Sequence, residues 1–151
     1  MLHVCSLAHL PGTVQATRAT HVITVMADVD RVQRPPSILQ DNHLVISMDD
    51  IIEEAEGFTA PALDHVERVL HFGRSWDRAA AMVIHCYAGI SRSTASAFAI
   101  ACALNPNRSE QQIAQRIRNG SALAHPNRLI VSHADPLLGR DGRMLRALDE
   151  M

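Results

Sequence analysis

Cys86 and Arg92 lie six positions apart, where a β-branched run gives way to an apolar, helix-like one. The residues before Cys86 are typical of a buried strand, and the loop that follows Cys86 contains Gly89. Inward-facing backbone N–H groups and the following helix N-terminus can together hold one anion. We therefore expect a phosphate-binding loop made by Tyr87, Ala88, Gly89, Ile90, Ser91 and Arg92.

The same positive potential favours the thiolate of Cys86, because cysteines at helix N-termini have a pKa well below the usual value of about 8.5. Arg92 can bind two phosphate oxygens with a planar fork that lysine lacks. Ser93 can donate a hydrogen bond to the sulfur as it leaves, and His85 is expected to hold the loop through backbone contacts. A buried structural cysteine beside a surface arginine is the alternative explanation of this spacing.

The segment from His85 to Ser93, HCYAGISRS, resembles the signature loop of cysteine-dependent protein tyrosine and dual-specificity phosphatases. The resemblance implies a single phosphatase domain over residues 1–151, with four parallel strands in the order 1-4-2-3 and the loop after the fourth. His125-Pro126-Asn127 resembles the Pro-Asn that opens a late helix in dual-specificity phosphatases. Elsewhere the similarity fades, which favours a divergent, bacterial-type branch.

A carboxylic acid near the loop is needed to protonate the leaving oxygen of a phosphoester. Asp49 and Asp50 follow the third expected strand, and the carboxyl ends of parallel strands meet at one edge of the sheet. Local chemistry does not separate the two residues. The resemblance favours Asp50, which precedes an isoleucine as in related sequences, and Asp49 is expected to support it.

Together these residues predict a hydrolase that cleaves phosphomonoesters through a phosphocysteine and needs no metal or other cofactor. Phosphotyrosine in proteins is the expected substrate, with phosphoserine, phosphothreonine and small phosphoesters left open. A catalytically inactive phosphate-binding module and an arsenate reductase are the alternatives. No pair of closely spaced cysteines follows the loop, which speaks against the reductase.

The rest of the chain predicts a three-layer α/β fold with a four-stranded, mostly parallel sheet and a helical C-terminal third. Helices are expected after Pro61, with Thr59 as cap, and over 91–104. Ser109 is the expected cap of a later helix, and Asn127 of another that ends at Asp135-Pro136. Strands are expected over residues 2–7, 21–26, 43–48 and 82–85, and a short helix over 13–18.

The formal charge of -2 over 151 residues provides no broad basic field, so neither nucleic acid nor a membrane is an expected partner. Met1–Gly12 contains no cationic leader, which indicates a cytoplasmic protein. Cys5, Cys86 and Cys102 are too far apart for a zinc site and are expected to be reduced thiols. The oligomeric state is left open.

Overall fold

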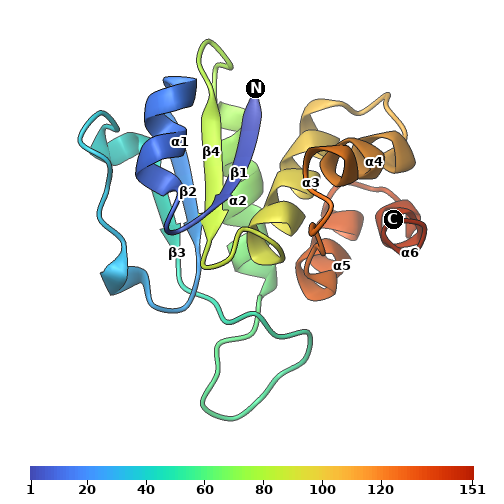
Figure 1. Cartoon of the computed structure of the whole chain (residues 1–151). Helices are drawn as coiled ribbons and strands as arrows, with labels where there is room; N and C mark the ends of the chain where they lie inside the picture. Colours follow the sequence, from blue (N-terminus) through green and yellow to red (C-terminus); the bar gives the residue numbers. More distant parts are fainter.

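The computed structural model describes residues 1–151 and consists of a parallel sheet with helices on both faces (Figure 1). The strands are β1 (Leu2–Ser6), β2 (His21–Val25), β3 (His43–Ile46) and β4 (Met82–Cys86). Their order is β1-β4-β2-β3, and each neighbouring pair is parallel. The predicted fold class and strand order are confirmed.

Each face of the sheet has its own layer of helices. Helix α1 (Leu10–Thr17) packs on the face that carries Val22 and Val83. Helices α2 (Leu63–Ser75) and α3 (Arg92–Leu104) pack on the other face, where Ile23 and Ile84 point. Adjacent residues thus serve opposite faces, as the two-residue period of a strand requires, and both faces are covered.

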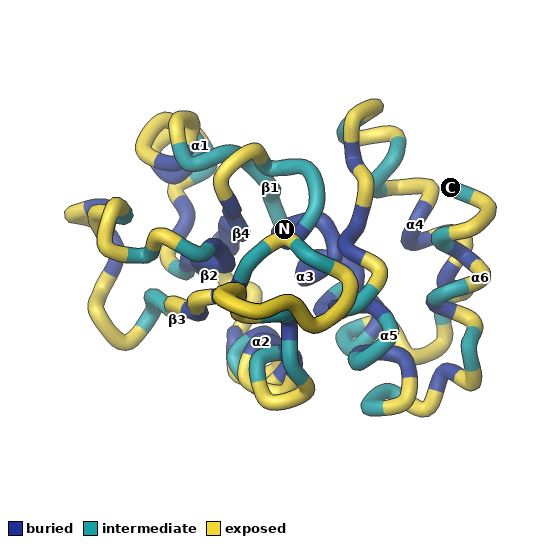
Figure 2. Tube along the Cα trace, turned by 90° about the horizontal axis from the view of Figure 1, so that it is seen from below, coloured by how far each residue is buried: buried dark blue, intermediate teal, exposed yellow.

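Helix α3 lies in the middle of the molecule, between the sheet and the C-terminal helices (Figure 2). Ten of its 13 residues are buried, so the helix predicted over 91–104 is packed on nearly all sides. Because Arg92 is its first residue, the functional loop is anchored at one end by this packed helix and at the other by β4.

The C-terminal third is helical, with α4 (Glu110–Gly120), α5 (Arg128–Leu137) and α6 (Arg143–Asp149). Ser109 and Asn127 cap α4 and α5 through hydrogen bonds from Gln112 N–H and Ile130 N–H, as predicted. Helix α5 is predicted to end at Asp135-Pro136, and it ends one residue later, at Leu137, with Pro136 in its last turn. There it costs the helix only one terminal N–H bond.

The connection from β3 to α2 is a long irregular loop over residues 47–62 (Figure 1). The expectation that Thr59 caps α2 is wrong, since α2 begins at Leu63 and Ala62 N–H is held by His65 Nδ1 at 3.1 Å. Thr59 N–H instead donates to Asp49 Oδ2 at 2.7 Å and closes the loop at its base. Two 3₁₀ turns, Val29–Arg31 and Gln40–Asn42, lie between β2 and β3. None of the helices combines the length and apolar character needed to span a bilayer.

Candidate active site

The loop from Cys86 to Arg92 joins β4 to α3 at the carboxyl edge of the sheet. Gly89 gives this loop its shape, with a φ of +74° that favours glycine. A Cβ at Gly89 would lie 2.6 Å from the carbonyl carbon of Cys5 and 2.7 Å from Ser6 N. The loop thus packs directly on the backbone of β1, and a larger residue does not fit.

The sulfur of Cys86 is enclosed by hydrogen-bond donors. Gly89 N–H donates to it at 3.2 Å, and Ser93 Oγ lies 3.1 Å away. Burial alone would raise the pKa of Cys86, but the Ser93 hydroxyl and the backbone N–H groups of Ser93, Gly89 and Ile90 outweigh it and lower the pKa below its usual value. The arrangement stabilises a thiolate.

The other two thiols show the opposite behaviour. Burial raises the pKa of Cys102 to about 12, and burial also raises the pKa of the half-buried Cys5. Of the three free cysteines, Cys86 alone has a lowered pKa. The difference arises from its hydrogen-bond donors, because burial acts in the same direction on all three.

Arg92 is only 8 % exposed and its guanidinium is held at one end, where Nη1 donates to Met48 O at 2.8 Å. Its Nε is buried and has no hydrogen-bond partner. A buried cationic N–H is stabilised by an acceptor within hydrogen-bond distance. A phosphate in the loop would suit it in charge and geometry.

The structure separates Asp49 from Asp50. Asp49 faces the base of the 47–62 loop, where Oδ2 accepts from Thr59 N–H. Asp50 Oδ1 accepts from Ser91 Oγ at 2.7 Å and from Asn127 Nδ2 at 2.8 Å. Asp50 is therefore attached to the Cys86–Arg92 loop through Ser91, while Asp49 contacts the other end of its own loop.

The segment before α5 holds the Cys86–Arg92 loop in place. His125 N–H donates to Ile90 O at 2.9 Å, and Asn127 N–H donates to Ser91 O at 3.2 Å. Asn127 also donates through Nδ2 to Ile51 O at 3.1 Å. Asn127 thus connects the Cys86–Arg92 loop to the loop that carries Asp50, a role that its sequence position as a helix cap did not reveal.

A buried hydrogen-bonded chain runs beneath the loop from His43 through Thr24 to His85. Thr24 Oγ1 lies 2.8 Å from His43 Nε2 and 2.7 Å from His85 Nε2. His85 Nδ1 lies 3.3 Å from the carbonyl oxygen of Cys86. Burial lowers the pKa of His85 to about 4, so this ring is neutral at pH 7. The sequence suggested backbone contacts for His85 but gave no sign of Thr24 and His43.

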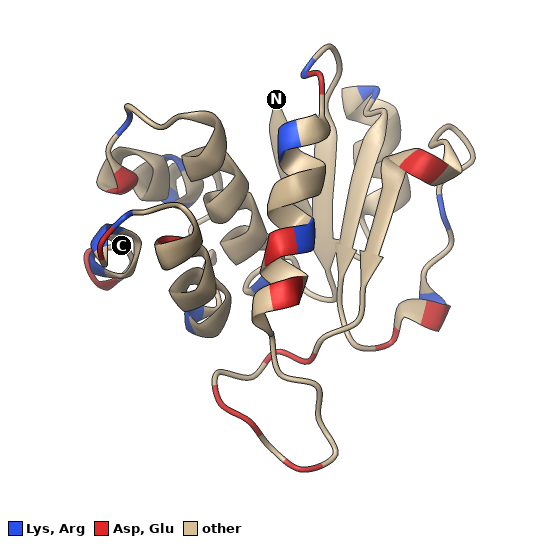
Figure 3. Ribbon diagram, turned by 180° about the vertical axis from the view of Figure 1, so that it is seen from behind, with Lys and Arg blue, Asp and Glu red and all other residues tan.

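A groove of about 570 Å³ runs beside the Cys86–Arg92 loop, between residues 50–55 and 125–128, and Ser91 lies on its wall. The 47–62 loop, part of which lines this groove, carries acidic residues and no basic one (Figure 3). Tyr87 in the Cys86–Arg92 loop is 57 % exposed, and Ile90 is partly buried. Asp50 thus faces an open groove next to the Cys86–Arg92 loop.

The structure is similar to several solved phosphatases. Human DUSP28 superposes with a TM-score of 0.70 and 18 % identity, over 92 % of this chain and 88 % of that one. The chain has the dual-specificity phosphatase fold. The PTP-2 phosphatase of Cydia pomonella superposes on this chain with a TM-score of 0.69 and 21 % identity, over 89 % of this chain and 84 % of that one. The human tyrosine phosphatase-like serine/threonine/tyrosine-interacting protein matches with a TM-score of 0.69 and 17 % identity, over 93 % and 92 %.

No protein-family model matches the sequence, and no curated protein sequence does either. The similarity thus lies in the fold, and the bacterial-type branch stays a prediction.

Proposed function

We propose that the protein is a cysteine-dependent phosphatase that hydrolyses phosphomonoesters in proteins, with phosphotyrosine as its main substrate and phosphoserine and phosphothreonine as further ones. The observation that carries the proposal is the Cys86–Arg92 loop, in which hydrogen-bond donors lower the pKa of Cys86 and the largely buried Arg92 is the first residue of α3. A nucleophile and an anion clamp on one loop are what a phosphoryl transfer through the enzyme requires.

In the proposed first step, Cys86 Sγ attacks phosphorus in line, forming an S–P bond while the ester P–O bond breaks. Arg92 and the loop N–H groups stabilise the charge on the non-bridging oxygens. Asp50 gives a proton to the departing oxygen. Its Oδ2 suits this role, because both hydrogen bonds from Ser91 and Asn127 use Oδ1.

In the second step, water attacks phosphorus and Asp50 takes its proton, so that inorganic phosphate is released and the S–P bond breaks. Ser93 Oγ, 3.1 Å from the sulfur, can stabilise the thiolate as it leaves. Asp49 would support the loop, and His85 would hold the backbone of Cys86. No step calls for a metal or other cofactor.

The aromatic ring of Tyr87 supports the preference for phosphotyrosine. It is 57 % exposed beside the phosphate loop, and the guanidinium carbon of Arg31 lies 6.0 Å from the ring centre. An exposed, oriented aromatic ring can stack on the ring of a phosphotyrosine. The proposed compartment is the cytoplasm, where the three free thiols would stay reduced.

The test is hydrolysis of an aryl phosphate by the wild-type protein, Cys86→Ser and the control Cys5→Ser. Turnover is expected for the wild type and Cys5→Ser and none for Cys86→Ser, which should still bind vanadate or tungstate. Oxyanion binding by the wild type without turnover would favour the inactive phosphate-binding module. Equal turnover by Cys86→Ser would remove the nucleophile assignment. A phosphopeptide panel then measures the preference for phosphotyrosine.

A further inference from the structure

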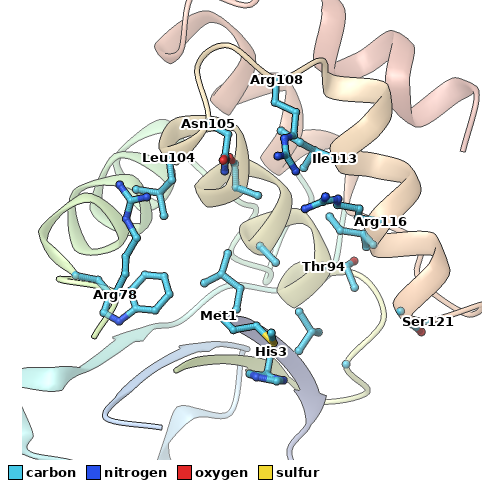
Figure 4. A pocket seen from close by; sticks show the side chains of 18 residues that line it. Met1, His3, Arg78, Thr94, Leu104, Asn105, Arg108, Ile113, Arg116 and Ser121 are labelled. Atoms are coloured by element: carbon cyan, nitrogen blue, oxygen red, sulfur yellow. The ribbon is translucent and has the colours of Figure 1, made fainter. Parts of the chain in front are cut away.

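A second cavity, of about 710 Å³, lies between β1, α3 and α4, and no residue lines both this cavity and the groove beside Asp50 (Figure 4). Its volume falls in the range of about 300–1,000 Å³ that is usual for small-molecule sites. Strand β1 is an edge strand, so the cavity opens where the sheet ends.

The floor of the cavity is apolar. It is formed by side chains from β1, from the turn after α2 and from the two helices: Leu2, Val4, Trp76, Leu104, Ile113 and Ile117. Leu2, Leu104 and Ile117 are only partly buried, although they pack against the main hydrophobic core. Apolar surface left accessible in a concave site favours a ligand with an apolar part.

The rim of the cavity is cationic. Arg78, Arg108 and Arg116 line it, and no aspartate or glutamate does. Figure 4 shows Arg108 and Arg116 directed towards the same part of the cavity, with Arg78 on the opposite side. The ion pairs of the molecule are made by Arg31, Arg128, Arg140 and Arg143, so the three rim arginines are without an acidic partner. This local positive charge contrasts with the formal charge of -2 of the whole chain.

We propose that this cavity binds a small anionic amphiphile, with its apolar tail on the floor and a carboxylate or phosphate head between Arg108 and Arg116. Guanidinium groups bind both kinds of head through paired hydrogen bonds. A neutral apolar ligand would gain nothing from the arginines, and a free anion would gain nothing from the floor. Gly89 of the Cys86–Arg92 loop also lines the cavity, but Cys86 and Arg92 do not, so the proposal does not depend on the proposed phosphatase activity.

The cavity contains its own reporter, because Trp76 is the only tryptophan of the chain and lines the floor. The residue is 5 % exposed and its Nε1–H donates to Ala80 O at 3.1 Å, which holds the indole in place beside the cavity. A titration of the whole protein with decanoate below its micelle concentration should give a saturable change in tryptophan emission. Calorimetry of the same titration measures binding independently of the fluorescence.

Decanol, which has the tail alone, and acetate, the head alone, should each bind at least about ten-fold more weakly than decanoate. Decyl phosphate distinguishes a phosphate from a carboxylate head; it is tested in Cys86→Ser, which prevents hydrolysis, with vanadate present to occupy the Cys86–Arg92 loop. The double variant Arg108→Gln/Arg116→Gln should lower the decanoate affinity by about ten-fold or more. Its control, Arg68→Gln/Arg146→Gln, removes the same charge from residues that do not line the cavity.

The control should leave the affinity within about two-fold of the wild type, because distant exposed charges are largely screened. The proposal would be overturned if neither fluorescence nor calorimetry detected decanoate binding. Equal affinity for decanol and decanoate would overturn it as well. So would unchanged affinity in Arg108→Gln/Arg116→Gln, since the charged rim would then play no part.

Discussion

Replacement of Ser93 by alanine should raise the pKa of the Cys86 thiol. Ser93 Oγ lies 3.1 Å from the sulfur, both residues are almost fully buried, and the hydroxyl is one cause of the lowered pKa of Cys86. A hydrogen bond to a charged group contributes about 1.5–3 kcal/mol, and one pKa unit corresponds to about 1.36 kcal/mol. Ser93→Ala should therefore raise this pKa by about one to two units.

The assay is the rate of alkylation by iodoacetamide as a function of pH, with the modified cysteine identified by peptide mass spectrometry. Cys5 and Cys102 interfere little at neutral pH, because burial raises the pKa of both. In the wild type, the alkylation rate of Cys86 should reach half its maximum below the usual pKa of a thiol. In Ser93→Ala, the midpoint of the alkylation rate should move to a higher pH.

Ser96→Ala is the matched control. Ser96 is buried on the same helix as Ser93, but its hydroxyl donates to Arg92 O at 2.8 Å and makes no contact with the sulfur. The reasoning is refuted if Ser93→Ala leaves the midpoint unchanged, or if Ser96→Ala shifts it as far. Either result would mean that the hydroxyl near the sulfur does not stabilise the thiolate.

Three further predictions concern the residues around the loop. Asp50→Asn should lower kcat/KM for an aryl phosphate by about 10²–10⁴. Asp49→Asn, which alters the contact with Thr59, should lower it much less. A larger loss in Asp49→Asn than in Asp50→Asn would show that Asp49 is the acid. Gly89→Ala should lower the free energy of unfolding, measured with urea, by about 2–5 kcal/mol, because its φ is left-handed and an added Cβ would collide with the backbone of β1. An unchanged urea midpoint would contradict the loop geometry. The pKa of His85 is about 4 in the folded protein and 6.5 in the unfolded chain, so the unfolded chain takes up the proton first as the pH falls. The free energy of unfolding should therefore decrease by about 3 kcal/mol between pH 6.5 and about pH 4. His85→Gln should show a smaller loss of stability between pH 7 and pH 4, and an equal loss would assign the effect to other groups.

Much of the fold follows from local sequence. The four strands are short apolar runs, and Ser109 and Asn127 cap their helices through contacts three residues away. Such contacts are visible in a sequence because both partners are close together in it. The error at Thr59 arose because Thr59 pairs with Asp49 at the base of the 47–62 loop, and α2 begins only at Leu63.

The site was predictable to the extent that it is one continuous segment. The loop from Cys86 to Arg92 is such a segment, and its spacing already indicates an anion site. The position of Asp50 depends instead on Ser91 and Asn127, which are 41 and 77 residues away in the sequence. Two adjacent aspartates look alike until the fold shows which one contacts the loop. The link from Thr24 to His85 crosses from β2 to β4 and is likewise visible only in three dimensions.

The most direct test of the central claim is to trap the phosphorylated intermediate. The wild-type protein is mixed with an aryl phosphate, quenched rapidly with acid, digested and analysed by mass spectrometry. The account predicts a phosphoryl group on the peptide that contains Cys86, attached to its sulfur, and none on the peptides of Cys5 and Cys102. Steady turnover with no phosphorylated cysteine, or with the phosphoryl group on another residue, would contradict it.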